Sequence, residues 1–232
     1  MCIRDRSILI PVYNEAKTIS ELLRRVSLTT IANEVIVIDD GSTDATTQIL
    51  KSLEDGKLKI IYQENNAGKG SAIREGLKQV TGDIVIIQDA DLEYDPRDYQ
   101  ALIEPIVSGK ADVVYGSRWL NQRLKKIPFS WFKLGRYLLT FLTNLLYKAK
   151  ITDEPCGYKV FKSGVISNIP LECKRFEFCP EITAKVCRLG YKIYEVPITY
   201  TPRSVKEGKK ISYRDGLEAV ATLIKYRFWK NR

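Results

Sequence analysis

Histidine is absent from this chain of 232 residues. No imidazole can therefore act as a general base, a proton shuttle or a metal ligand. This excludes hydrolases with a catalytic histidine and zinc enzymes with histidine ligands. Cysteine is scarce as well: the five cysteines are odd in number and contain no Cys-x-x-Cys pair. A zinc site or a disulfide framework is therefore not expected, and we interpret the cysteines as reduced thiols.

Long hydrophobic runs are also missing, because no stretch approaches the roughly 18 consecutive apolar residues of a membrane-spanning helix. Acidic residues are outnumbered: 37 Lys and Arg face 28 Asp and Glu, which gives a formal charge of +9. A basic chain favours an anionic partner, and nucleic acid, a phosphorylated substrate and an anionic membrane surface all qualify. The content of 44% hydrophobic and 28% charged residues is ordinary for a globular protein.

Apolar runs alternate with segments of helical periodicity in the first half of the chain. Strands are predicted at 7–12, 34–39, 58–62, 83–88 and 111–115, and helices at 15–26, 44–53, 68–80 and 98–107. This alternation is typical of βαβ units and predicts an α/β fold with a mostly parallel sheet. Residues 1–6 resemble neither a signal peptide nor the strand that follows, so no structure is predicted for them.

The pattern changes after about Gly116. Residues 118–136 hold six basic residues and no acid. Helices are predicted at 134–147, 180–189 and 213–228, and a strand at 191–198. The helix at 134–147 is apolar with basic flanks, so the pattern fits packing in the core and a position in a membrane interface equally well. We place a functional boundary near residue 117.

Acidic residues follow three of the predicted strands. Glu15 comes just past the first, Asp39 and Asp40 end the second, and Asp89 and Asp91 come after the fourth. The carboxyl ends of parallel strands meet at one edge of a sheet, where ligands bind. Carboxylates crowded there raise each other's pKa unless a cation balances them. Asp89 and Asp91 therefore predict a site for Mg²⁺ or Mn²⁺, which one or two carboxylates and substrate phosphates commonly hold.

Four short motifs occur in the order and spacing of family 2 glycosyltransferases: residues 11–15 (PVYNE), 37–44 (VIDDGSTD), 66–70 (NAGKG) and 88–91 (QDAD). The chain resembles that family from residue 7 to about 120. The resemblance implies a GT-A fold, in which a Rossmann-like, mostly parallel sheet flanked by helices is joined to a smaller acceptor-side region. Residues 7–117 would then bind the nucleotide sugar, and residues 118–232 would form the acceptor and membrane-interface region of the same domain.

The resemblance also implies roles for single residues. Pro11, Tyr13, Glu15 and Asp39 would line the nucleoside pocket, and Asp89 and Asp91 would bind the metal and the donor diphosphate, with Glu93 as a helper. Residues 66–71 do not form a P-loop. They are interpreted either as a helix N-terminus near the nucleotide, which makes Lys69 a nucleotide-binding candidate, or as a plain turn.

Motifs in the second half are similar to those of polyprenyl-phosphate glycosyltransferases. They are residues 116–118 (GSR), 152–159 (TDEPCGYK), 178–181 (FCPE), 202–203 (PR) and 208–211 (GKKI). Many members of that group continue into transmembrane helices, and this chain resembles the peripheral ones. The resemblance implies inverting transfer of a hexose from a GDP-mannose-type or UDP-glucose-type donor to a polyprenyl phosphate, at the cytoplasmic, inner face of the cell membrane.

Transfer to a lipid phosphate needs cations rather than a general base, because a phosphate monoester is already anionic near neutral pH. The candidates for binding the acceptor phosphate are Arg118, Arg136, Arg203 and Lys209. Asp91, Arg118 and Arg203 are the predicted catalytic residues. Three alternatives remain: transfer to a saccharide hydroxyl, a sugar nucleotidyltransferase, and a basic nucleic-acid-binding module. The last is disfavoured because the basic residues flank an apolar helix rather than an aromatic sheet face.

Overall fold

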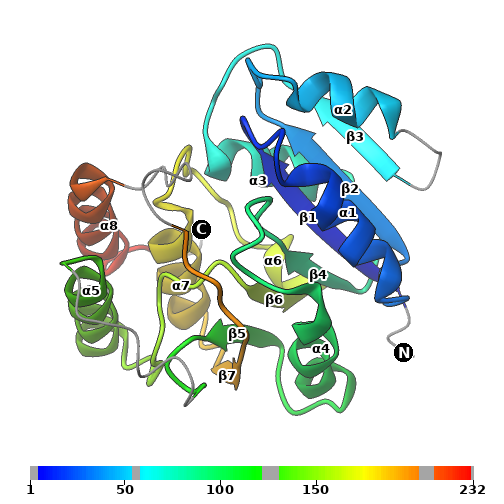
Figure 1. Ribbon diagram of the computed structural model, residues 1–232. Coiled ribbons are helices and arrows are strands. Elements are labelled where there is room, and N and C mark those ends of the chain that lie inside the picture. Colours follow the sequence, from blue (N-terminus) through cyan, green and yellow to red (C-terminus); the bar gives the residue numbers. More distant parts are fainter. Residues whose placement is uncertain (1–4, 54–57, 122–130, 204–211, 231–232) are drawn as a thin grey trace.

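The computed structural model describes residues 5–53, 58–121, 131–203 and 212–230. Within these ranges, seven strands form one sheet in the order β3-β2-β1-β4-β6-β5-β7 (Figure 1). The strands are β1 (Arg6–Val12), β2 (Glu34–Asp39), β3 (Leu58–Tyr62), β4 (Ile84–Ile87), β5 (Val113–Ser117), β6 (Lys159–Lys162) and β7 (Ile193–Pro197). The helices are α1 (Ile19–Leu28), α2 (Thr46–Ser52), α3 (Lys69–Leu77), α4 (Tyr99–Val107), α5 (Trp131–Tyr147), α6 (Ser163–Ile166), α7 (Phe178–Arg188) and α8 (Tyr213–Tyr226), with a 3₁₀ turn η1 (Pro96–Asp98) before α4.

All strands of the sheet except β6 run in the same direction. β6 is antiparallel to both of its neighbours, β4 and β5, whereas the remaining neighbours pair in parallel. The sheet confirms the predicted α/β class. The sequence does not predict β6, because four residues that begin and end with lysine carry too little periodicity to be recognised.

Most element boundaries differ from the predicted ones by a few residues, and two displaced starts are described here. Helix α1 begins at Ile19 rather than at Glu15, because the amides of Thr18 and Ile19 both donate to the Glu15 carbonyl and close a turn first. Strand β1 begins at Arg6, one residue inside the segment for which no structure is predicted. In both cases the element type is right and only its start is displaced.

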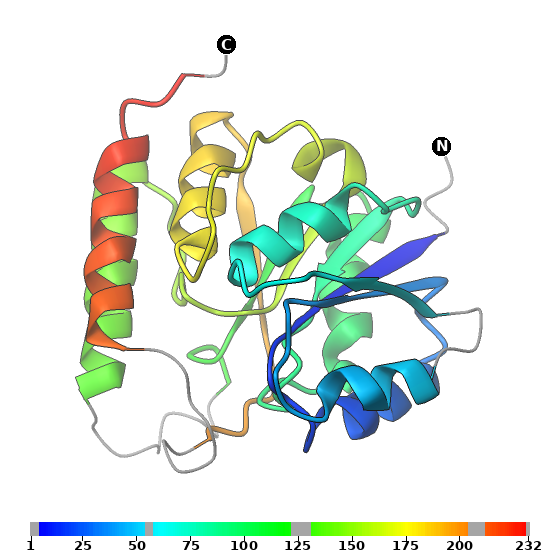
Figure 2. The same ribbon diagram turned by 90° about the horizontal axis from the view of Figure 1, so that it is seen from above.

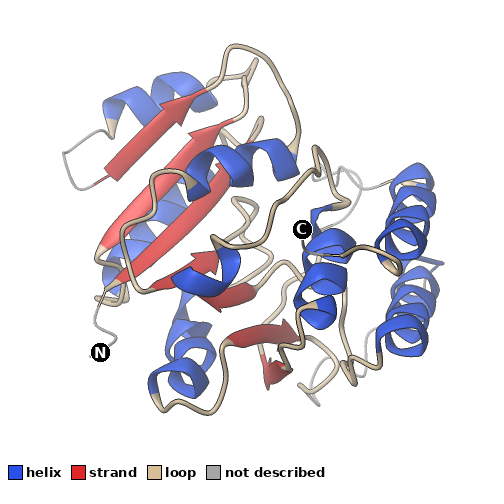
Figure 3. Cartoon of the chain, turned by 180° about the vertical axis from the view of Figure 1, so that it is seen from behind, coloured by secondary structure: helices blue, strands red, loops and turns tan. Residues whose placement is uncertain are grey.

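The strands alternate their side chains between two apolar cores, one on each face of the sheet. On β1, Ile8 and Ile10 join the core under α1, α2 and α4, while Leu9 joins the core under α3, α6 and α7. Seen from behind, helices cover both faces (Figure 3). All three residues are completely buried, as expected for a strand in the middle of a parallel sheet.

Helices α5 and α8 lie side by side in an outer layer that rests on α7 (Figure 2). Leu139, Ala219 and Leu223 pack against Ala184 of α7 in a small third core. Other sides of the two helices are apolar and exposed, and we call the following residues the outer apolar face: Tyr137, Leu138, Phe141, Leu145, Leu217 and Ile224. The predicted helix at 134–147 therefore has both a packed side and an exposed side. Across the described ranges, no helix has the length and hydrophobicity to cross a bilayer.

The directions of the strands decide which segments meet at the carboxyl edge of the sheet. For the parallel strands, these are the residues that follow each strand. For the reversed strand β6, it is the segment that precedes the strand, residues 153–158. The acidic residues after β2 and β4 and the segment before β6 therefore share one edge.

Candidate active site

The two acids of the predicted metal site, Asp89 and Asp91, follow β4 directly, and each is paired with a cation of the protein. Asp89 forms an ion pair with Lys69 at the start of α3. The Oδ2 atom of Asp91 lies 3.1 Å from Nη2 of Arg203, and its Oδ1 accepts a bond of 3.0 Å from the Glu93 amide. Two residues far apart in the sequence, Lys69 and Arg203, thus converge on the predicted metal ligands.

The carboxyl group of Asp91 is strongly perturbed. Burial, together with the nearby charges of Asp89 and Glu93, raises its pKa to about 7, while the charge of Arg203 acts in the opposite direction. The acids Glu15, Asp89, Asp91 and Glu93 also outnumber the two cations beside them, Lys69 and Arg203. That excess is the condition under which a bound divalent cation is stabilising.

Arg203 connects three acids of the site. Its Nη1 and Nη2 lie 3.0 and 3.2 Å from the carboxylate of Glu15, which is buried at the end of β1. Its amide donates a bond of 2.8 Å to Oε1 of Glu93. The buried Nε of Arg203 has no hydrogen-bond partner. The sequence predicts Glu15 for the nucleoside and Arg203 for the acceptor, and the fold places the two in one ion pair.

Glu93 is turned toward the segment that carries Arg203. Its second carboxylate oxygen, Oε2, accepts a bond of 3.1 Å from the Tyr200 hydroxyl. Among the described residues, no group of three or more Asp, Glu and Cys side chains is arranged to hold a metal. A pair of carboxylates such as Asp89 and Asp91 would fit an ion that takes one or two carboxylates and its other ligands from phosphates.

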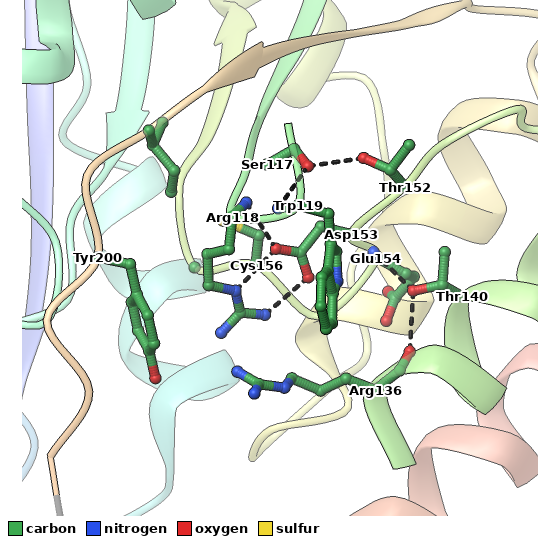
Figure 4. A network of polar contacts seen from close by, with 12 residues as sticks. Ser117, Arg118, Trp119, Arg136, Thr140, Thr152, Asp153, Glu154, Cys156 and Tyr200 are labelled. Carbon is green, nitrogen blue, oxygen red and sulfur yellow. Dashed lines mark hydrogen bonds and ion pairs between the residues drawn. The ribbon is translucent and has the colours of Figure 1, made fainter. Parts of the chain in front are cut away.

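Arg118 lies directly after β5 and is buried against Asp153 and Tyr200 (Figure 4). The Asp153 carboxylate accepts bonds from Nε and Nη2 of Arg118 at 2.7 and 2.8 Å. The guanidinium also lies over the Tyr200 ring, 5.0 Å from the centroid. Although burial disfavours the charged form, the Asp153 carboxylate raises the pKa of Arg118 well above its ordinary value.

Tyr200 neighbours two of the predicted acceptor residues and is linked to the third, Arg203, through Glu93. Its ring contacts Arg118, its hydroxyl bonds to the Glu93 carboxylate that holds the Arg203 amide, and the charge of Arg136 acts on its hydroxyl. In Figure 4 the Arg136 side chain extends from α5 toward Tyr200 and Arg118. Arg118 and Arg136 thus lie beside Tyr200, whereas the guanidinium of Arg203 pairs with Glu15 and Asp91. Lys209 lies outside the described residues.

Gly157, in the segment before β6, approaches Asp89 closely. A Cβ atom at this position would lie 2.3 Å from Oδ2 of Asp89. The Gly157 amide donates a bond of 3.0 Å to the hydroxyl of Tyr94, whose ring stacks on Tyr158 and Tyr200. Sequence reasoning assigns no role to Gly157, Tyr94, Tyr200 or Asp153. The only signal available is that Asp153 and Gly157 stand inside the motif at residues 152–159.

The acids after β2 differ in what they contact. Asp40 accepts bonds of 2.8 Å from the amides of Ala67 and Gly68, so it supports the loop before α3. Asp39 accepts bonds of 3.1 Å from the Ser42 amide and 2.6 Å from the Thr47 hydroxyl. Both are buried, and burial raises the pKa of Asp40.

The segment at 66–71 forms a helix N-terminus, since α3 begins at Lys69. The amides of Gly70 and Ser71 already donate to the carbonyls of Arg175 and Lys174. These two amides are therefore engaged by the protein itself, and the Lys69 side chain is the group of this helix that reaches the acidic pair.

Two further nucleotide candidates lie near the end of β1. Pro11 is buried within the strand and Tyr13 is half-buried just past it. Between Tyr13 and Glu15, Asn14 adopts a positive φ of 50° and its side chain accepts a bond of 2.8 Å from the Thr43 amide. The loops after β1 and β2 are thereby tied together at the carboxyl edge.

The sheet order and the acidic pair after β4 define the fold of a GT-A glycosyltransferase. Among solved structures, glucosyl-3-phosphoglycerate synthase of Mycobacterium tuberculosis with bound UDP matches with a TM-score of 0.75 at 22% identity, over 97% of this chain and 80% of that one. Structures of the same enzyme contain Mn²⁺ or Mg²⁺ together with UDP. At this identity the likeness concerns the fold.

The chain belongs to glycosyl transferase family 2, whose model matches residues 7–169. It is 33% identical over 228 residues to the UDP-N-acetylglucosamine–dolichyl-phosphate N-acetylglucosaminyltransferase of Methanococcus voltae, covering 88% of this chain and 89% of that protein. It is 30% identical to the dolichol-phosphate mannosyltransferase of Pyrococcus furiosus, covering 88% of this chain and 58% of that protein. It spans 33% of the length of glycosyltransferase AglD of Haloferax volcanii, to which it is 29% identical over 85% of this chain. The family membership confirms the resemblance and decides against a sugar nucleotidyltransferase.

Proposed function

We propose that this chain transfers a hexose, with inversion, from a GDP-mannose-type or UDP-glucose-type donor to a polyprenyl phosphate. The observation that carries the proposal is the position of two arginines, Arg118 and Arg136, beside Tyr200, together with a third, Arg203, that contacts Asp91. An acceptor phosphate needs cationic positioning and no general base, and the chain contains no histidine to act as one. The names of the Methanococcus and Pyrococcus relatives, which specify dolichyl and dolichol phosphates, support the same acceptor class.

In this proposal residues 7–117 bind the donor. Pro11, Tyr13, Glu15 and Asp39 surround the nucleoside, while Lys69 and Asp89 face the diphosphate. Asp89 and Asp91 hold Mg²⁺ or Mn²⁺, and Glu93 helps by fixing the Arg203 segment through its two carboxylate oxygens. When bound, the metal neutralises the negative charge that develops on the leaving nucleoside diphosphate.

Residues 118–232 bind the acceptor. Arg118, Arg136, Arg203 and Lys209 surround the lipid phosphate, and the arginines offer paired N–H donors that match its oxygens. They hold the phosphate oxygen in line with the sugar. Their main contribution to the reaction is therefore to orient the nucleophile, not to transfer a proton.

The acceptor would be met at a membrane surface, with the protein peripheral to the inner, cytoplasmic face. The outer apolar face supports this arrangement, because four of its six residues, Tyr137, Leu138, Phe141 and Leu145, stand on the helix that also carries Arg136. Lys148 and Lys150 flank α5, and each basic residue close to an anionic surface contributes about 1 kcal/mol to binding. The affinity of the protein for vesicles should therefore be modest and sensitive to salt.

The test is product formation with a short-chain polyprenyl phosphate, measured in parallel with saccharide acceptors and with GDP and UDP sugars. Arg118→Ala should depress transfer about 10-fold or more, while donor binding stays nearly unchanged. Arg203→Ala should depress transfer as well, and it should also alter donor binding because it removes the cation that pairs with Glu15 and Asp91. Arg24→Ala is the matched control, because Arg24 is exposed on α1 and its side chain forms an ion pair with Glu21 of the same helix. Efficient glycosylation of a saccharide hydroxyl, with none of the lipid phosphate, would refute the acceptor class and leave the family membership standing.

A further inference from the structure

Arg118 is fastened by Asp153 at its backbone as well as at its side chain. The Asp153 carboxylate accepts a bond of 2.9 Å from the Arg118 amide, in addition to the bonds from Nε and Nη2 at 2.7 and 2.8 Å. Asp153 is completely buried, and Arg118 is 8% exposed. A pair with this many contacts fixes the plane of the guanidinium and the direction in which its remaining donors point (Figure 4).

The donors that remain face the acceptor side. A guanidinium has five N–H groups, of which Asp153 takes two, so that three are left (5 − 2 = 3) on Nη1 and Nη2. The Tyr200 ring covers one face of the group. In Figure 4 the outer nitrogens of Arg118 point toward the space between Tyr200 and Arg136. The pairing therefore leaves the phosphate-binding edge of Arg118 directed toward the other arginines.

The segment that carries Asp153 is itself held from two directions. The Asp153 amide donates a bond of 3.1 Å to Glu195 of β7, and the Glu154 amide donates a bond of 3.1 Å to the Thr140 hydroxyl of α5. One turn further along α5, Asn144 exchanges two hydrogen bonds, of 2.7 and 3.0 Å, with the backbone of Ile151. The position of Asp153 is thus set by the sheet and by the helix that carries the outer apolar face.

We infer that Asp153 is a positioning residue for the acceptor: it orients Arg118 so that the free edge of the guanidinium meets the phosphate. The inference rests on the proposed function. Asp153 is shielded from the acceptor by Arg118 and acts only through it. If the affinity for the acceptor phosphate depended only on the net charge of the site, the negative charge of Asp153 would weaken phosphate binding. A benefit from Asp153 therefore has to come from orientation.

The decisive experiment is a double-mutant cycle of Arg118→Ala and Asp153→Asn. Asp153→Asn should raise the KM for polyprenyl phosphate about 10-fold, because coupled pairs interact this strongly. The donor Kd, measured by calorimetry, should stay within about two-fold of the wild type. In the Arg118→Ala background, Asp153→Asn should have no further effect on the acceptor KM, since the residue through which it acts is gone.

The control for loss of a hydrogen-bonded carboxylate is Glu34→Gln. Glu34 binds Ser7, Lys59 and Thr81 at the opposite end of the sheet. This variant should lower the melting temperature without changing the acceptor KM. The inference would be overturned if the fold-increases in acceptor KM of the two single variants multiplied in the double mutant. It would also be overturned by an unchanged acceptor KM in Asp153→Asn.

Two outcomes keep the inference apart from the proposed function. If the wild type transfers sugar to another acceptor and not to polyprenyl phosphate, the proposed function fails, and the same cycle on that acceptor still decides whether Asp153 acts through Arg118. If Asp153→Asn does not fold, Thr140→Val is measured instead. It removes the hydroxyl that holds the Glu154 amide, so it should raise the acceptor KM two-fold or more at constant donor Kd, and an unchanged KM would count against the inference.

Discussion

The donor side and the acceptor side of the site are built by different means. On the donor side, Asp39 is the last residue of β2 and Asp89 comes two residues after the end of β4, so the sheet itself sets their positions. On the acceptor side, Arg136 stands on α5 and Arg203 follows β7, and contacts between side chains hold them in place. The carboxyl edge of the sheet thus supplies the acids, whereas the cations come from separate segments of the chain. Substitution of a donor-side acid should therefore abolish most of the activity, whereas substitution of a single acceptor-side arginine should reduce the activity only in part.

The largest effect is expected at the acid that a strand end positions. Asp91→Ala should lower transfer about 1,000-fold, because the site loses a ligand for the metal that stabilises the leaving diphosphate. EDTA should have the same effect on the wild type, and added Mn²⁺ should restore activity only there. The assay is product formation from a nucleotide sugar. Asp112→Ala, a partly exposed acid paired with Lys162, serves as control. Full activity in EDTA would contradict the metal assignment.

The boundary between the two sides is Gly157, which comes from the second half of the chain and touches Asp89 of the first. In Gly157→Ala the new Cβ, 2.3 Å from Oδ2 of Asp89, must displace that carboxylate. A shift of this kind should lower kcat about 100-fold. Gly164→Ala is the matched control, because no atom lies within 4 Å of a Cβ there. Equal activities of the two variants would show that the Asp89 position is not critical.

The next largest effect is expected at Glu154, whose buried carboxyl group should lower the stability of the folded chain when it is ionised. Burial, opposed by Lys159, raises its pKa from 4.5 to about 7. Between these values the folded chain binds more protons than the unfolded chain, so stability falls as pH rises through this window and levels off above it.

Glu154→Gln should not show this decrease in stability with rising pH. Its free energy of unfolding should match that of the wild type near pH 5 and exceed it by roughly 2–3 kcal/mol at pH 8. Urea unfolding across this range measures the difference. The exposed Glu104→Gln should follow the wild type at every pH. A constant difference between Glu154→Gln and the wild type would contradict the predicted titration.

The smallest effect is expected at the outer apolar face. Leu145→Ser should weaken binding to anionic vesicles by about 1 kcal/mol, because a half-inserted leucine loses part of its burial energy. Leu28→Ser on α1 is a close control, since both leucines are 66% exposed. A sedimentation assay measures vesicle binding. Equal losses in both variants would show that α5 has no special contact with the lipid surface.

The sequence predicts the donor side better than the acceptor side for a physical reason. Acids that follow apolar strands can be located from periodicity alone, and Asp89 and Asp91 lie where that reasoning places them. Lys69 is also predicted near the nucleotide, although its ion pair with Asp89 is not. The predicted sheet and its flanking helices are confirmed, with shifted ends where a turn such as the one at Glu15 precedes the helix.

The acceptor side depends on contacts that no local pattern contains. Asp153 meets Arg118 across 35 residues of sequence, and Tyr200 meets Glu93 across 107. Both contacts require β6 to be recognised and its direction to be known. Because β6 has four residues, its reversal is invisible in the sequence. The three arginines can be proposed singly from motifs and from charge, but the meeting of Arg118 and Arg136 at Tyr200, and of Arg203 with Asp91, follows only from the completed sheet.

The place of β5 in the sheet has a consequence for synthesis of the protein on the ribosome. β5 pairs only with β6 and β7, and both come later in the chain. After Ser117 the ribosome must add the 41 residues 118–158 before the first partner begins at Lys159. At translation rates of about 5–20 residues per second, this takes roughly 2–8 s. For that time, the apolar segment Val113–Ser117 has no strand to pair with. A nascent chain stalled just past residue 117 would therefore expose an unpaired strand, which makes this interval the one in which a chaperone has most to protect.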